Sequence, residues 1–72
     1  MPTDPLLPDE CQRGASFAVT YGMDNPRNAV WQVRVIVDGL ACCRKRQGDR
    51  WRYECFGPGF FRVNEANIEW RG

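Results

Sequence analysis

Hydrophobic and polar residues alternate along most of this chain, which is the period-two pattern of β-strands. The segment SFAVTYG (residues 16–22) places Phe17, Val19 and Tyr21 on one face and small or polar residues on the other. We therefore predict a half-buried strand here. The following segment, MDNPRN, predicts a turn or open loop, because Asp, Asn and Pro each favour turn geometry.

The strongest local signal is AVWQVRVIVDGLACCRKR, residues 29–46. Two β-rich runs flank Asp38-Gly39, the preferred central pair of a two-residue type I′ hairpin turn. The turn predicts four cross-strand pairs on one face: Val37–Leu40, Val35–Cys42, Val33–Arg44 and Trp31–Arg46. A second reversal at residues 47–50 pairs the middle strand with RWRYECF and predicts Arg46–Trp51, Arg44–Tyr53 and Cys42–Cys55.

These pairs predict an inner face that contains Trp31, Trp51 and Tyr53 together with Arg44 and Arg46. The opposite, outer face then carries the row Ile36–Ala41–Phe56 and the row Arg34–Cys43–Glu54. Arginine is rarely buried without a partner. Two interpretations stay open: the guanidinium groups reach water while they stack on the Trp rings, or an exposed Trp–Arg–Trp platform binds a planar or anionic partner.

The two ends of the chain differ from the middle. Pro2, Pro5 and Pro8 predict that residues 1–14 form a Pro-rich arm, or a short helix that begins at Pro8 and ends at Gly14. Residues 15–72 are predicted to be one small β domain. In the tail, GPG ends the meander, FFRV is predicted as a short strand, NEAN as a single helical turn and IEW as the last strand.

A meander followed by a strand, a 3₁₀ turn and a last short strand resembles the SH3-like small β-barrels. The resemblance covers about residues 15–70 and rests on the order of the elements. It implies an all-β fold, either a small SH3-like barrel or a strongly twisted antiparallel meander of five to six strands. The SH3-like class includes the type II dihydrofolate reductases, but the motif of their pore is not found in this sequence. The resemblance therefore implies no particular function.

Length and composition narrow the function classes. A chain of 72 residues is one domain with a marginal core, and its three Trp, two Tyr and four Phe supply core material and partner surface. We therefore expect a homodimer or another protein partner. The net charge of +1 conceals a cluster, because residues 44–52 hold five cations and one acid. No signal peptide or membrane span is found, so a cytoplasmic location is expected.

Candidate catalytic chemistry is sparse. The chain has no His and only one Lys, Lys45, so we expect no enzyme and no cofactor. Four cysteines occur without a C-x-x-C motif, and adjacent Cys42 and Cys43 would point to opposite faces of a strand, so no metal site is expected. The predicted neighbours Cys42 and Cys55 could form a cross-strand disulfide in an oxidising environment or remain two reduced thiols.

We therefore expect a non-catalytic binding module that acts by protein–protein recognition or self-association. Very small domains of this kind are often accessory proteins of mobile genetic elements. The predicted binding surface comprises Trp31, Arg44, Arg46, Arg50, Trp51, Arg52 and Tyr53, and the outer residues Ile36 and Phe56 are a second candidate interface. The alternative function is weak, sequence-tolerant binding of nucleic acid through the basic and aromatic hairpin Arg44–Arg52.

Overall fold

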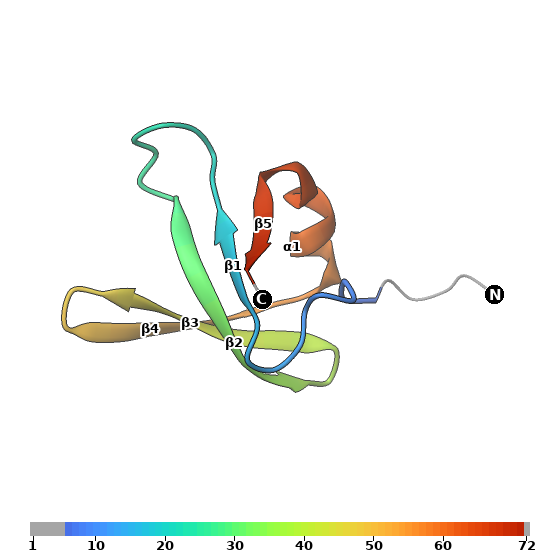
Figure 1. Ribbon diagram of the computed structural model, residues 1–72. Helices are drawn as coiled ribbons and strands as arrows, with labels where there is room; N and C mark the ends of the chain where they lie inside the picture. Colours follow the sequence, from blue (N-terminus) through green and yellow to red (C-terminus); the bar gives the residue numbers. More distant parts are fainter. Residues whose placement is uncertain (1–5, 72) are drawn as a thin grey trace.

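The computed structural model describes residues 6–71, which form one five-stranded antiparallel sheet with the strand order β4-β3-β2-β1-β5 (Figure 1). The strands are β1 (Ser16–Val19), β2 (Ala29–Val37), β3 (Leu40–Gln47), β4 (Arg50–Phe56) and β5 (Ile68–Arg71). A short helix, α1 (Pro58–Val63), and a 3₁₀ turn, η1 (Glu65–Asn67), connect β4 to β5. The predicted all-β class is confirmed. The sheet is an open meander, because β4 and β5 are its two edges and do not pair to close a barrel.

Both predicted reversals of the meander occur. Asp38 and Gly39 both have positive φ angles, 52° and 76°, as a type I′ turn requires. At the second reversal only Gly48 has a positive φ, 64°, which is the pattern of a type II′ turn. The predicted register of β3 and β4 is confirmed, with Arg46 opposite Trp51, Arg44 opposite Tyr53 and Cys42 opposite Cys55.

The predicted register of β2 and β3 holds only near the turn. Val35 lies opposite Cys42 as expected, but Val33 lies opposite Cys43 instead of Arg44. A β-bulge at Arg34 inserts one unpaired residue between them. Because side chains alternate with a period of two, this single insertion turns Val33 and Trp31 to the other face. The predicted pairs Val33–Arg44 and Trp31–Arg46 are therefore wrong.

Long-range backbone contacts explain why the bulge sits where it does. The Val33 amide donates to the Ala15 carbonyl at 2.8 Å, and the Gly14 amide donates to the Val33 carbonyl at 2.9 Å. Both bonds come from the segment before β1, which lies far from β2 in sequence. They hold Val33 against the two residues that precede β1, and the Val33 side chain is fully buried in the core.

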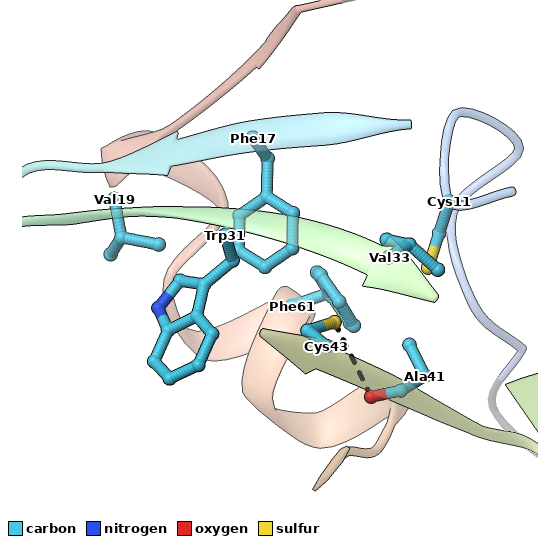
Figure 2. Close-up of a cluster of buried hydrophobic side chains, with 8 residues drawn as sticks. All are labelled: Cys11, Phe17, Val19, Trp31, Val33, Ala41, Cys43 and Phe61. Atoms are coloured by element: carbon cyan, nitrogen blue, oxygen red, sulfur yellow. Dashed lines mark hydrogen bonds between the residues drawn. The ribbon is translucent and has the colours of Figure 1, made fainter. Parts of the chain in front are cut away.

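The bulge also exchanges the two faces that the sequence predicted. Ala41 and Cys43 of β3 are fully buried, and Phe56 of β4 packs against the core. Their neighbours Cys42 and Cys55 lie on the opposite side, where Cys55 is exposed. Figure 2 shows Cys43 directed into the cluster, with its thiol donating to the Ala41 carbonyl at 3.4 Å. The face predicted to be inner is thus the solvent face along β3 and β4.

An aromatic cluster completes the core. The Phe17 ring of β1 lies 5.4 Å from Phe61 and 5.0 Å from Trp70, measured between ring centroids. The prediction of a strand at FFRV is wrong, because Pro58–Val63 is helical. Pro58 has the fixed φ that suits a first helical turn, and the helix buries Phe61 while Phe60 stacks on Phe56 at 4.1 Å. The predicted helical turn at NEAN and last strand at IEW are confirmed.

The N-terminal segment follows the arm alternative over its described part. No helix forms between Leu6 and Gly14; the Cys11 amide donates to the Pro8 carbonyl, and the Ala15 amide to the Gln12 carbonyl, so two turns replace it. Cys11 is buried in the core cluster. The prediction for residues 1–5 lies outside the described residues.

Candidate functional site

One side of the sheet carries no covering element among residues 6–71. The helix α1 and the N-terminal arm pack on the core side, as the burial of Phe61 and Cys11 shows. We call the other side the outer sheet face. It presents alternate residues of three strands: Val30, Gln32, Val35 and Val37 of β2, Cys42, Arg44 and Arg46 of β3, and Trp51, Tyr53 and Cys55 of β4.

The centre of this face is a stack of two arginines on one indole. The guanidinium carbon of Arg44 lies 3.9 Å from the centroid of the Trp51 ring, and that of Arg46 lies 5.2 Å from it. Arg44 Nε donates to Gln32 Oε1 and Arg46 Nε donates to the Gly48 carbonyl, each at 3.0 Å. These bonds orient both guanidinium groups over the ring, so the stack is held in place before any ligand arrives.

The stack of Arg44 and Arg46 on Trp51 is exposed and carries positive charge, so a ligand can reach it from solvent. Trp51 is 41% exposed and Tyr53 is 64% exposed. Among residues 6–71, one ion pair forms, between Arg52 and Glu54 at 4.0 Å, and it lies on the core side of the hairpin. Within the same residues, no carboxylate pairs with Arg44 or Arg46. Figure 1 shows that the tip of the β3–β4 hairpin reaches away from α1 and β5.

Aliphatic side chains extend the outer sheet face toward the β2–β3 turn. Val35, Val37 and Leu40 each expose more than two-fifths of their surface. An apolar strip next to an aromatic and arginine centre is the composition of protein interfaces, in which Trp, Tyr and Arg are enriched.

The structure does not bring the whole predicted binding surface together. Arg44, Arg46, Trp51 and Tyr53 share the outer sheet face, whereas Arg50 and Arg52 alternate to the other side of β4. Trp31 is only 5% exposed and belongs to the core, so the predicted Trp–Arg–Trp platform is wrong. The second predicted interface is divided in the same way, since Phe56 packs into the core while Ile36 remains exposed near the turn.

On the core side, residues that the sequence analysis did not group form a shallow groove of about 480 Å³. Trp31, Phe56 and Phe60 line it, and the cations Arg27, Lys45 and Arg52 stand around it. The loop between β1 and β2 forms one wall of this groove. A hydrogen bond orders the loop, since Asn28 Oδ1 accepts from the Tyr21 amide at 2.7 Å. The Asn residues of the MDNPRN segment were the available signal for this ordered loop.

The pKa values of three thiols, Cys11, Cys42 and Cys43, lie above the ordinary value of a cysteine. Burial raises the pKa of Cys43 to about 12 and also raises the pKa of Cys11 above its ordinary value. The hydrogen bond with Cys55 raises the pKa of Cys42. Among residues 6–71 no group of three or more His, Cys, Asp or Glu side chains could hold a metal ion.

Two further observations complete the description. No helix within residues 6–71 has the length and apolar character needed to cross a membrane. Comparison of the chain with known protein families, with curated proteins and with solved structures finds no match.

Proposed function

We propose that this chain is a non-catalytic binding module whose outer sheet face recognises an acidic and partly apolar surface on another protein. The observation that carries the proposal is the stack of Arg44 and Arg46 on the exposed Trp51 ring, on a face that no element within residues 6–71 covers. Arginine donors held in a fixed orientation fit carboxylates in a bidentate manner. The exposed aromatic rings beside them supply apolar area.

The strand order gives context to the proposal. The proposal includes an SH3-like arrangement of the strands, which is supported by the pairing of β5 with β1 beside the β2–β4 meander. Binding is argued from the outer sheet face alone, because one fold serves many functions.

A protein partner fits this face better than a nucleic acid. The basic hairpin Arg44–Arg52 divides its charges between two sides, with Arg44 and Arg46 on one side and Lys45 and Arg52 on the other. A phosphate backbone needs cations along one continuous track. The aliphatic strip of Val35, Val37 and Leu40 on the outer sheet face offers nothing to phosphates, whereas it can be buried against a protein.

A different protein also fits better than a second copy of this chain. A twofold interface brings the same patch of both copies together. Centred on Trp51, such an interface would place Arg44 and Arg46 of one copy near those of its partner, and like charges at an interface oppose association. An interface with a different protein avoids this repulsion when the partner places carboxylates opposite the two arginines.

Selection from a displayed library of random peptides tests the proposal. The wild-type chain should enrich peptides in which Asp or Glu flanks an apolar residue, and Trp51→Ala should not. For an enriched peptide, calorimetry should show that Trp51→Ala raises Kd by about 30-fold or more, because removal of an interface hot spot costs about 2 kcal/mol or more. Arg62→Ala is the matched control, since it removes an exposed cation from α1 on the other side of the sheet.

Three results would refute the proposal. The first is equal or absent enrichment on wild type and Trp51→Ala. The second is Trp51-dependent binding of a single-stranded oligothymidylate that weakens steeply with salt, which would identify a nucleic-acid surface. The third is a dimer in light scattering that Trp51→Ala converts to a monomer, which would identify self-association through this face.

A further inference from the structure

Cys42 and Cys55 occupy the cross-strand position that best suits a disulfide. Gln47 and Arg50 flank the two-residue turn, so they form a hydrogen-bonded pair, and the pair type alternates from there along the ladder. Five steps further, Cys42 and Cys55 form a non-hydrogen-bonded pair, in which opposite Cα atoms lie about 4.5 Å apart and the side chains approach closely. A separation of this size is within the range that a disulfide spans.

Contact and exposure set this pair apart from the other two cysteines. The Sγ atoms of Cys42 and Cys55 are in direct contact at 2.7 Å, and both residues are free thiols. Cys55 is exposed, so an oxidant can reach it from solvent, and Cys42 is partly exposed beside it. Cys11 and Cys43 are buried in the core, where oxidants have little access.

We propose that Cys42 and Cys55 are a redox-sensitive modification site, which peroxide converts to a cross-strand disulfide on the outer sheet face and thiols reduce again. Hydrogen peroxide takes two electrons from the Cys55 sulfur, which becomes a sulfenic acid as one water is released. The Cys42 sulfur then attacks the Cys55 sulfur and displaces a second water. Overall, two thiols and one peroxide give one disulfide and two waters. A dithiol reductant reverses the reaction by exchange.

The disulfide closes a covalent ring around the hairpin that carries the arginine and tryptophan stack. Arg44, Arg46, Trp51 and Tyr53 all lie between the two cysteines in sequence. The cross-link therefore restricts the separation of β3 from β4 at the open end of the hairpin. Its consequence for partner binding rests on the function proposed above, whereas its formation requires no partner.

Peroxide treatment followed by intact-mass measurement and peptide mapping tests the site. The wild-type chain should lose two hydrogens, keep two free thiols in denaturant and yield one linked peptide pair that joins Cys42 to Cys55. Its Tm should rise by about 10 °C, because the cross-link limits the unfolded chain, and dithiothreitol should return it to the starting value. Cys42→Ser and Cys55→Ser should each abolish both the linked pair and the rise in Tm.

The matched control is the double variant Cys42→Ser/Cys55→Ser, which keeps the two buried thiols and should show neither change. A linked pair that includes Cys11 or Cys43, dimers joined between chains, or thiols that stay reduced or advance to sulfinic acid in the folded protein would overturn the proposal. Because the mass readout uses no ligand, a failed peptide selection with an intact disulfide refutes the proposed function and leaves this site supported.

Discussion

The exchange of the two sheet faces can be tested at two neighbouring residues. Cys43 is fully buried, and its thiol donates to the Ala41 carbonyl at 3.4 Å, whereas Cys42 lies on the outer sheet face. In Cys43→Ser the shorter carbon–oxygen bond leaves the hydroxyl farther from the Ala41 carbonyl oxygen than the roughly 2.5–3.0 Å typical of O–H···O bonds. A buried hydroxyl without a good partner costs about 1–3 kcal/mol, so Cys43→Ser should lower the free energy of unfolding by that amount. Cys42→Ser should change it by less than about 0.5 kcal/mol.

Urea unfolding in reducing buffer, followed by tryptophan fluorescence, measures both variants. A loss of 1 kcal/mol lowers the Tm of a domain of this size by about 4–8 °C, so in thermal melting the Tm of Cys43→Ser should lie roughly 4–24 °C below that of the wild type. Thiol alkylation gives an independent readout. At pH 8 a thiol with a pKa of about 12 is ionised in about one molecule in ten thousand, so Cys43 should react only through unfolding. If Cys42→Ser is the more destabilising variant, or if Cys43 is alkylated first in the folded protein, the assignment of faces is wrong.

Two other predictions concern the core. Phe17→Leu removes the ring that contacts Phe61 and Trp70, so it should lower the free energy of unfolding in urea by about 1–3 kcal/mol. Val63→Ala, at an exposed position of α1, should change it by less than about 0.5 kcal/mol. Equal effects of the two substitutions would contradict the core assignment. The free energy of unfolding should fall as pH rises above about 9, because the unfolded chain then releases the Cys43 proton while the folded chain holds it until about pH 12. This thiol contributes a slope of at most about 1.4 kcal/mol per pH unit, and Cys43→Ala should make the pH dependence flatter. A slope unchanged in that variant would show that other groups cause the alkaline loss.

The candidate site was predictable in part. The paired positions Arg46–Trp51 and Arg44–Tyr53 followed from the second reversal alone, because a tight turn specifies the register of the strands that it joins. The inclusion of Trp31 failed, because the bulge at Arg34 lies four residues from the nearest turn and depends on hydrogen bonds from Gly14 and Ala15. Local pattern carries no information on such distant backbone contacts.

The sequence by itself determined the five strands, the two tight turns, the β3–β4 register and the 3₁₀ turn before β5, but it did not determine the helix α1, which the pattern of FFRV predicted as a strand. These features depend on residues close together in the chain: period-two alternation, the positive φ that Asp38-Gly39 and Gly48 accept, and the turn chemistry of Asn and Pro. Each is a local preference that acts before the chain has a core.

Only the tertiary structure decided which face of β3 and β4 became the core. Both faces carry enough apolar residues to be buried, with Cys42, Tyr53 and Trp51 on one and Ala41, Cys43 and Phe56 on the other. The choice came from what covers them, since Phe17 of β1 and the Phe60 and Phe61 rings of α1 pack on the second set. Burial stabilises a face only when another element removes it from water, and the outer sheet face has no such element within residues 6–71.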